Sequence, residues 1–171
     1  LLCGMPNYDP FVEAISDAVS AAWQRDTLLT VYDYGDDLEM AAHILRQLDQ
    51  RPCAGVILAS PVTRAFDFSP FDALIHKPVV LLNQYDPQRP LLPTFLPDDR
   101  ANACQIVNHL LSQGITRIAH IMGDDWMDAS VLRLEGYRQT LEQAGIAVDE
   151  ALIKQTDWSL NATFNATLEL M

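Results

Sequence analysis

Long apolar runs and positive charge are both scarce in this sequence of 171 residues. No apolar run reaches the roughly 18 residues that a membrane-spanning helix needs, so we expect no membrane partner. Only 11 lysines and arginines stand against 23 aspartates and glutamates, which makes the formal charge −12. A chain this acidic repels the phosphate backbone of nucleic acids, so we do not expect it to bind DNA or RNA by itself.

Cysteine and glycine are also infrequent, and neither forms a motif of cofactor or nucleophile chemistry. The three cysteines, at positions 3, 53 and 104, are widely spaced and make no zinc-binding pattern. We therefore expect small buried thiols and a reducing compartment. The seven glycines form no dinucleotide-binding or phosphate-binding loop, and no G-x-S-x-G turn carries a serine nucleophile.

Histidines and paired aspartates are the remaining candidates for metal or catalytic chemistry. The four histidines share no ligand spacing; His43 and His109 fall within predicted helices and His120 within a predicted strand, so structural roles are favoured. The pairs Asp98-Asp99 and Asp124-Asp125 hold the oxygen ligands that Mg²⁺ prefers, but helix capping and loop solvation are the preferred interpretation. We predict no metal, no cofactor and no catalytic residue, and thus no enzyme.

Apolar spacing divides the chain into alternating strands and helices. Strands are predicted over residues 1–5, 27–34, 54–59, 78–83, 94–96, 117–122 and 151–155, and helices over 9–25, 36–48, 70–76, 98–113, 130–144 and 159–171. Gly114 is expected to end its helix in the left-handed conformation, and Gly145 is expected to close the helix before it. The strands are continuous apolar runs, which indicates burial on both faces of a parallel sheet. The predicted class is therefore α/β, with helices on both faces.

Polar and aromatic residues follow the predicted strands, where open α/β sheets bind ligands. These segments are 6–9, 34–36, 60–61, 83–86 and 123–126. Carboxylates and amides exchange hydrogen bonds with hydroxyl groups, and aromatic rings cover the C–H face of a ring. The set suits a polyhydroxylated ligand, although surface loops are polar in any protein, and both interpretations stay open on this pattern alone.

Several motifs occur in a fixed order along the chain. Asp99 to Ala103 reads D-x-x-x-A, and His109 to Gly123 contains H-L and G-x-x-x-I-A-x-I-x-G. Arg133 to Tyr137 reads R-x-x-G-Y, and residues 54–58 read A-G-V-I-L. Together these motifs resemble the lactose-repressor (LacI/GalR) family of regulators over the whole chain, with Ala54 standing where that family usually has aspartate.

The resemblance implies the type I periplasmic-binding-protein fold, in which two lobes of doubly wound parallel sheet hold a ligand between them. Residues 1–113 would form the N-terminal lobe and residues 114–171 part of a C-terminal lobe that is incomplete in this chain. The family's helix-turn-helix DNA-binding head is also expected to be absent from this chain.

The resemblance also implies a set of ligand-binding residues. Arg133 matches a family arginine that binds ligand hydroxyls, with a surface salt bridge to Glu135 or a nearby aspartate as the alternative. Asp99 matches an acidic ligand-facing residue, and Trp158 an aromatic one, for which packing between lobes is the alternative. The remaining candidates lie in loops after predicted strands and are Asn7, Tyr8, Asp9, Phe11, Ser60, Pro61, Trp126 and Asp128.

We therefore interpret the chain as the effector-binding and dimerisation core of a LacI-type regulator, a cytoplasmic repressor that switches by lobe closure when a sugar or sugar derivative binds. A homodimer is expected, with helices such as residues 9–25 at its interface, and DNA would be bound only through the head. The alternative is a periplasmic sugar-binding protein of an ABC transporter. A flavodoxin-like or hydrolase enzyme would need a nucleophile or cofactor loop that the sequence does not contain.

Overall fold

The computed structural model describes the backbone of residues 1–3, 9–35 and 37–171, and the side chains of residue 1 and of residues 12–35 and 37–171. The chain divides into two compact units, Leu1–Leu96 and Pro97–Met171. The expected boundary followed residue 113, but the helix over residues 99–112 packs on the next helix of the chain and so belongs to the second unit. No helix in the described part of the chain is long and apolar enough to cross a membrane.

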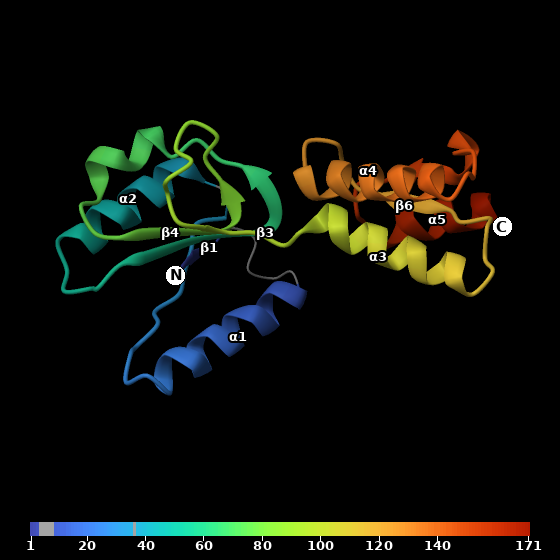
Figure 1. Ribbon diagram of the computed structural model, residues 1–171. Coiled ribbons are helices and arrows are strands. Elements are labelled where there is room, and N and C mark those ends of the chain that lie inside the picture. The colour runs from blue at the N-terminus through green and yellow to red at the C-terminus, as the bar shows by residue number, and fades with distance from the viewer. Residues whose placement is uncertain (4–8, 36) are drawn as a thin grey trace. The chain divides into compact units, whose positions relative to one another are not determined.

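A parallel sheet runs through the first unit (Figure 1). Within the described residues its strand order is β2-β1-β3-β4-β5. The strands are β1 (Leu2–Cys3), β2 (Tyr32–Asp33), β3 (Val56–Ala65), β4 (Val79–Tyr85) and β5 (Thr94–Phe95). Every pairing is parallel, as between Leu58 of β3 and Leu81 of β4, so the predicted α/β class is confirmed.

Helices connect these strands, and in the second of them side-chain hydrogen bonds to the first backbone N–H groups mark the start of the helix. The helices are α1 (Asp9–Trp23), α2 (Leu38–Asp49) and the short 3₁₀ helix η1 (Ser69–Leu74). The Asp37 carboxylate accepts hydrogen bonds from the backbone N–H groups of Glu39 and Met40. These two donors have no partner within the first turn of α2, so the aspartate stabilises the start of the helix.

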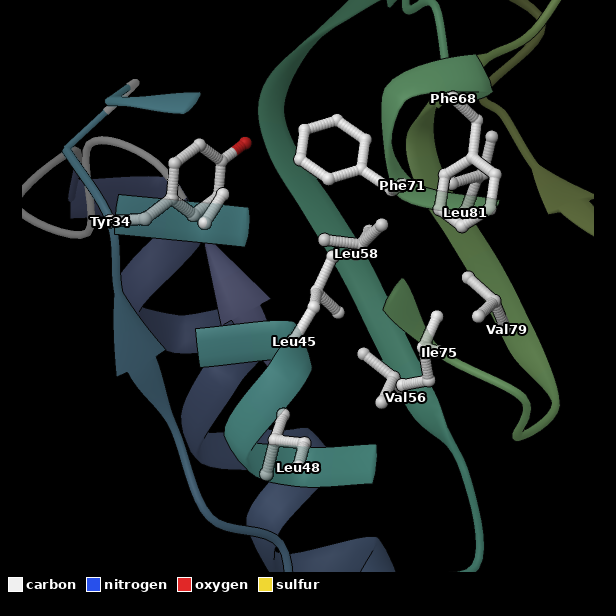
Figure 2. Close-up of a cluster of buried hydrophobic side chains, with 11 residues drawn as sticks. Tyr34, Leu45, Leu48, Val56, Leu58, Phe68, Phe71, Ile75, Val79 and Leu81 are labelled. Carbon is white, nitrogen blue, oxygen red and sulfur yellow. The ribbon is translucent and has the colours of Figure 1, made fainter. Parts of the chain in front are cut away.

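The core of the first unit lies between α2, η1 and one face of the sheet (Figure 2). Leu45 of α2, Leu58 of β3 and Leu81 of β4 are fully buried there, and the Phe71 ring of η1 stacks on Phe66 with the centroids 5.6 Å apart. Ile57 and Ala59, which flank Leu58 along β3, belong to a second apolar cluster with Leu1 and Ile15. Because side chains alternate along a strand, β3 is apolar on both faces, as the continuous run predicted.

The second unit combines three α-helices with a short parallel strand pair, β6-β7, among the residues described (Figure 1). Its elements are α3 (Asp99–Ser112), β6 (His120–Met122), α4 (Asp128–Gln143), the 3₁₀ helix η2 (Glu150–Leu152), β7 (Ile153–Gln155) and α5 (Leu160–Leu170). Asp98 caps α3 by accepting from the Ala101 N–H, which supports its capping interpretation. Gly114 follows α3 with φ of +80°, so its left-handed helix end is confirmed, and Gly145 closes α4 as predicted, with φ of +71°.

Strand lengths differ from those expected, because a ladder needs a neighbour as well as a suitable composition. Among the described residues, the strand pairing within the run 27–34 is confined to Tyr32–Asp33, which lie alongside β1. Conversely, β3 continues beyond the apolar run that ends at Ala59, because Arg64 and Ala65 pair with the end of β4 after a register shift.

Candidate functional site

The second unit brings the D-x-x-x-A and R-x-x-G motifs together, because α3 and α4 approach closely. Gly136 of α4 faces the backbone of α3: a Cβ atom there would lie 2.5 Å from the Arg100 carbonyl oxygen and 3.0 Å from the Ala103 Cβ. A glycine opposite an alanine therefore sets the distance between the two helices. One turn before each of these small residues, Asp99 and Arg133 face each other.

Arg133 and Asp99 form the main polar contact of this helix pair. The Arg133 Nε group donates to Asp99 Oδ1 at 2.8 Å, and Nη2 lies 2.7 Å from the same oxygen in an ion pair. The Asp99 side chain is 1% exposed and that of Arg133 is 46% exposed. The carboxylate is thus an internal anchor that holds the guanidinium in one orientation, and the guanidinium is the part that a ligand can reach. Glu135, the alternative partner, pairs with Arg100 instead.

Trp158 lies next to this pair, so three of the predicted residues meet in one unit. The Arg133 Cζ atom lies 5.9 Å from the centroid of the Trp158 ring, which is within cation–π range. Trp158 is half-buried and has φ of +63°, a conformation that is uncommon for a residue with a bulky side chain. Arg133 and Trp158 together present N–H donors and an aromatic ring, the combination that suits a hydroxylated ring.

His120 supports this arrangement from β6. Its ring stacks on Tyr137 with centroids 5.2 Å apart, and the Tyr137 hydroxyl donates to the Ile118 carbonyl. Burial, and secondarily the positive charge of Arg133, lower the pKa of His120 from its ordinary value of 6.5. A neutral histidine beside Arg133 adds no repulsion to the guanidinium.

The other two candidates in this unit lie before Arg133 and differ in exposure. The Trp126 side chain is largely exposed in the loop before α4. Asp128 is the first residue of α4, and its Oδ2 atom is buried without a hydrogen-bond partner among the described residues. The structure therefore places both near the start of α4, and neither forms a hydrogen bond or ion pair with Arg133 among the described residues.

The first unit holds the remaining candidates. Ser60 and Pro61 lie in the register shift of β3, and the fully buried Ser60 hydroxyl donates to the Val62 carbonyl at 2.8 Å. Asn7 and Tyr8 lie outside the described residues, as do the side chains of Asp9 and Phe11. Their ligand-binding role remains a prediction.

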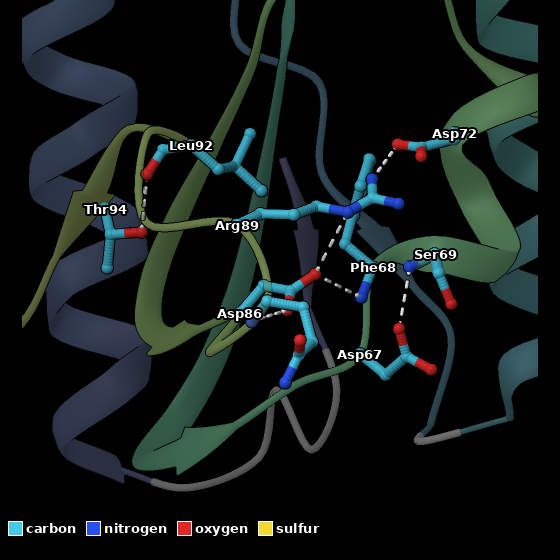
Figure 3. A network of polar contacts seen from close by, with 9 residues as sticks. Asp67, Phe68, Ser69, Asp72, Asp86, Arg89, Leu92 and Thr94 are labelled. Atoms are coloured by element: carbon cyan, nitrogen blue, oxygen red, sulfur yellow. Dashed lines mark hydrogen bonds and ion pairs between the residues drawn. The ribbon is translucent and has the colours of Figure 1, made fainter.

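Asp86, one of the polar residues after β4, has a structural role (Figure 3). Its buried carboxylate accepts from the Phe68 N–H at 3.1 Å and the Gln88 N–H at 2.8 Å, and Arg89 Nε lies 3.4 Å away. Arg89 also pairs with Asp72 of η1. These bonds tie the loop after β4 to the start of η1, so a polar residue at a strand end is not by itself a ligand contact.

Two features of this site were not predicted from the sequence. His120 was expected to be only structural, yet its ring and Arg133 line one apolar pocket of about 180 Å³ between α3, β6 and α4. Gly136 was noted as part of a motif, but its role as the point of helix contact depends on tertiary packing. In the part of the chain that the structure describes, no group of three or more His, Cys, Asp or Glu side chains is placed to hold a metal ion.

Comparison with known proteins agrees with the resemblance of the motifs. The family model described as periplasmic binding proteins and sugar binding domain of the LacI family matches residues 4–171. The transcriptional regulator DegA of Bacillus subtilis is 34% identical over 119 residues, which are 67% of this chain and 34% of DegA. The transcriptional repressor CytR of Escherichia coli is 36% identical over 107 residues, which are 60% of this chain and 31% of CytR.

A solved structure supports the fold. The crystal structure of a LacI-family transcriptional regulator from Rhizobium etli superposes with a TM-score of 0.86 at 22% identity and covers 98% of this chain and 61% of that one. This chain spans about a third of the length of the two curated relatives.

Proposed function

The chain belongs to the family of periplasmic binding proteins and LacI-family sugar-binding domains, and from this premise we propose that it is the effector-binding part of a LacI-type transcriptional regulator. Its effector would be a sugar or a related polyhydroxylated metabolite. The relatives DegA and CytR are both helix-turn-helix regulators, which favours a regulator over the transport protein that shares the family's fold.

The observation that carries the ligand class is the Arg133–Asp99 pair beside Trp158. The Nε–H group is committed to the Asp99 carboxylate and Nη2 is paired with the same oxygen, so the guanidinium keeps further N–H donors for a ligand. Such donors bind the hydroxyl groups of a ring, while an aromatic face covers its C–H groups. A hydrogen bond to a charged group is worth about 1.5–3 kcal/mol, so two such bonds supply most of the roughly 5.5 kcal/mol that reverses a two-state equilibrium.

The remaining parts of the proposal concern the whole protein. We propose that it acts as a homodimer in the cytoplasm and binds DNA through a separate head domain. The charge of −12 makes this part of the protein a poor DNA ligand by itself. The effector would then act by shifting the protein between states that differ in DNA affinity, with no covalent chemistry in this chain.

Isothermal titration calorimetry of this chain with a panel of uncharged sugars and nucleosides tests the ligand class. Arg133→Ala is expected to abolish binding of whichever compound binds, and Arg138→Ala, which removes an exposed ion pair with Glu150, is the matched control. Equal affinity of the Arg133→Ala variant and the unaltered chain would overturn the assignment of the site.

The codons upstream of Leu1 in the parent gene test the regulator against the transport protein. About 60 codons encoding a helix-turn-helix are expected, since a DNA-binding head of this kind is a small bundle of helices. A secretion signal running directly into Leu1 would contradict the regulator and favour the periplasmic alternative.

A further inference from the structure

Gly123 directly follows β6, and the Trp158 ring fills the space that a side chain at this position would need. No other glycine that the structure describes is blocked by this ring. A Cβ atom on Gly123 would lie 1.6 Å from Trp158 Nε1 and 2.1 Å from its Cδ1. By contrast, Gly114 and Gly145 have no atom within 4 Å of the same position. These two glycines have positive φ, and Gly123 does not. The backbone thus permits a side chain at Gly123, and the indole ring excludes it.

The turn that carries Trp158 is held against the same strand end. The Thr156 hydroxyl donates to the Met122 carbonyl at 2.9 Å, and the Thr156 N–H donates to the same oxygen at 2.8 Å. On the far side of Trp158, the Asp157 carboxylate accepts from the Ser159 N–H at 2.9 Å. The unusual backbone conformation of Trp158 persists because these bonds fix both of its neighbours. The indole therefore lies across Gly123 because of a specific local structure.

The Arg133 guanidinium lies over the same ring, so the position of the indole decides which surface the guanidinium meets. The distance of 5.9 Å from Arg133 Cζ to the ring centroid depends on the ring lying over Gly123. The charge of Arg133 is already compensated by the buried Asp99 carboxylate. The surface beside Trp158 thus offers N–H donors and an aromatic face without a net positive charge to attract an anion.

We propose that Gly123 is a positioning residue for ligand recognition: the space left by its missing side chain seats the Trp158 indole beside Arg133, as a platform for the apolar face of an uncharged sugar ring. This inference rests on the function proposed above. Aromatic rings stack on such faces, and the Arg133 donors bind the hydroxyls at the rim of the same ring. Phosphorylated sugars are expected to bind more weakly, because the charge of Arg133 is paired with Asp99 and is not free to bind a phosphate group.

Fluorescence tests the seating of the ring without any ligand. In a Trp23→Phe, Trp126→Phe background, Trp158 is the only tryptophan. Gly123→Ala is expected to shift its emission to longer wavelength and to increase quenching by acrylamide, because the displaced ring enters water. Gly145→Ala, which strains a left-handed glycine away from Trp158, is the control and should change neither. Unchanged emission and quenching in Gly123→Ala would overturn the positioning role.

A double-mutant cycle tests the platform with cellobiose, D-galactose, D-ribose and glucose 6-phosphate as probes. Gly123→Ala is expected to weaken the best uncharged sugar about tenfold, the value of one lost stacking contact, and to have no effect in a Trp158→Leu background. Trp158→Phe, with its smaller ring, should partly restore affinity to the Gly123→Ala variant. Equal losses in both backgrounds would show that Gly123 acts independently of the ring.

The outcomes separate this inference from the proposed function. Tightest binding of glucose 6-phosphate would overturn the uncharged class, even with the cycle intact. If none of the probes binds and Arg133→Ala changes no titration, the proposed ligand site fails. The fluorescence result then still decides whether Gly123 positions Trp158.

Discussion

Arg133 directs both its Nε and its Nη2 groups at a single oxygen of Asp99, and Asp99 is almost wholly buried whereas Arg133 is not. The pair is therefore asymmetric: the carboxylate is an internal anchor and the arginine carries the exposed surface. Sequence comparison alone treats the two residues as equivalent ligand contacts. From the structure we propose that Asp99 acts on a ligand only through the orientation of Arg133.

Asp99→Asn tests this asymmetry. The substitution keeps the size of the side chain but removes the charge that makes the hydrogen bond from Nε and the ion pair with Nη2 strong. We expect sugar affinity to fall about tenfold, roughly 1.4 kcal/mol, because the guanidinium loses its fixed orientation. Calorimetric titration measures the change, and Glu135→Gln is the control, since it alters only the exposed pair with Arg100. Equal losses in both variants would contradict an anchoring role for Asp99.

Gly136→Ala is expected to destabilise the second unit although alanine is the better helix former. The gain in helix propensity is at most about 1 kcal/mol. Against it, the new Cβ atom would lie 2.5 Å from a backbone oxygen of α3, and overpacking of this kind costs about 1–3 kcal/mol. Urea unfolding should therefore show a net loss of about 1 kcal/mol. Glu135→Ala, on the adjacent exposed position, provides the comparison, and a stabilised Gly136→Ala variant would refute the close helix contact.

The stability of the chain should decrease as the pH falls below about 6.5, in part because of His120. Burial and the charge of Arg133 lower the pKa of this histidine, so between its folded pKa and 6.5 the unfolded chain binds more protons than the folded one. Stability then rises with pH through that window and levels off above it. His120→Phe, which keeps an aromatic ring next to Tyr137, should flatten the dependence in thermal unfolding between pH 5 and pH 7.

The aspartates with lowered pKa values affect stability in a lower pH range than His120 does, so the two effects can be separated. Hydrogen bonds with His76 lower the pKa of Asp49, and hydrogen bonds with Ser69 and Ser159 lower those of Asp67 and Asp157, from an ordinary value of 3.8. The contribution of these aspartates to the stability of the folded chain is present above pH 3.8 and is lost on acidification below it. An undiminished slope near pH 6 in His120→Phe would assign the effect to other groups; His109→Asn, on the exposed face of α3, is the matched variant.

Asp86→Asn is expected to destabilise the first unit by about 2 kcal/mol. Each oxygen of Asp86 accepts from a different backbone N–H group, so an amide can serve only one of them and leaves the other donor unpaired in a buried place. Denaturant unfolding measures the loss. Asp67→Asn, at an exposed residue of the loop before η1, should cost less than 1 kcal/mol. Comparable losses of unfolding free energy in the two variants would show that the hydrogen bonds of Asp86 in Figure 3 stabilise the first unit no more than an exposed aspartate does.

Helix positions were predictable to within a few residues because their ends depend on local groups. Asp98 caps α3 and Gly145 ends α4 through bonds or backbone angles that involve only neighbouring residues. The capping residue of α2 is Asp37, whereas the predicted helix began at residue 36, which lies outside the described residues. Strand ends were less predictable, because β3 extends as far as its pairing with the end of β4.

The sequence by itself determined the class and family of this protein, since alternating apolar runs and amphipathic stretches dictate an α/β fold and the order of motifs identifies the LacI-type ligand-binding domain. It also identified Arg133, Asp99 and Trp158 as residues of interest. Only the tertiary structure decided how they act together. Whether Asp99 is an anchor, and whether Trp158 lies over Gly123 beside Arg133, depends on burial and on contacts between residues far apart in the chain, and no local pattern carries that information.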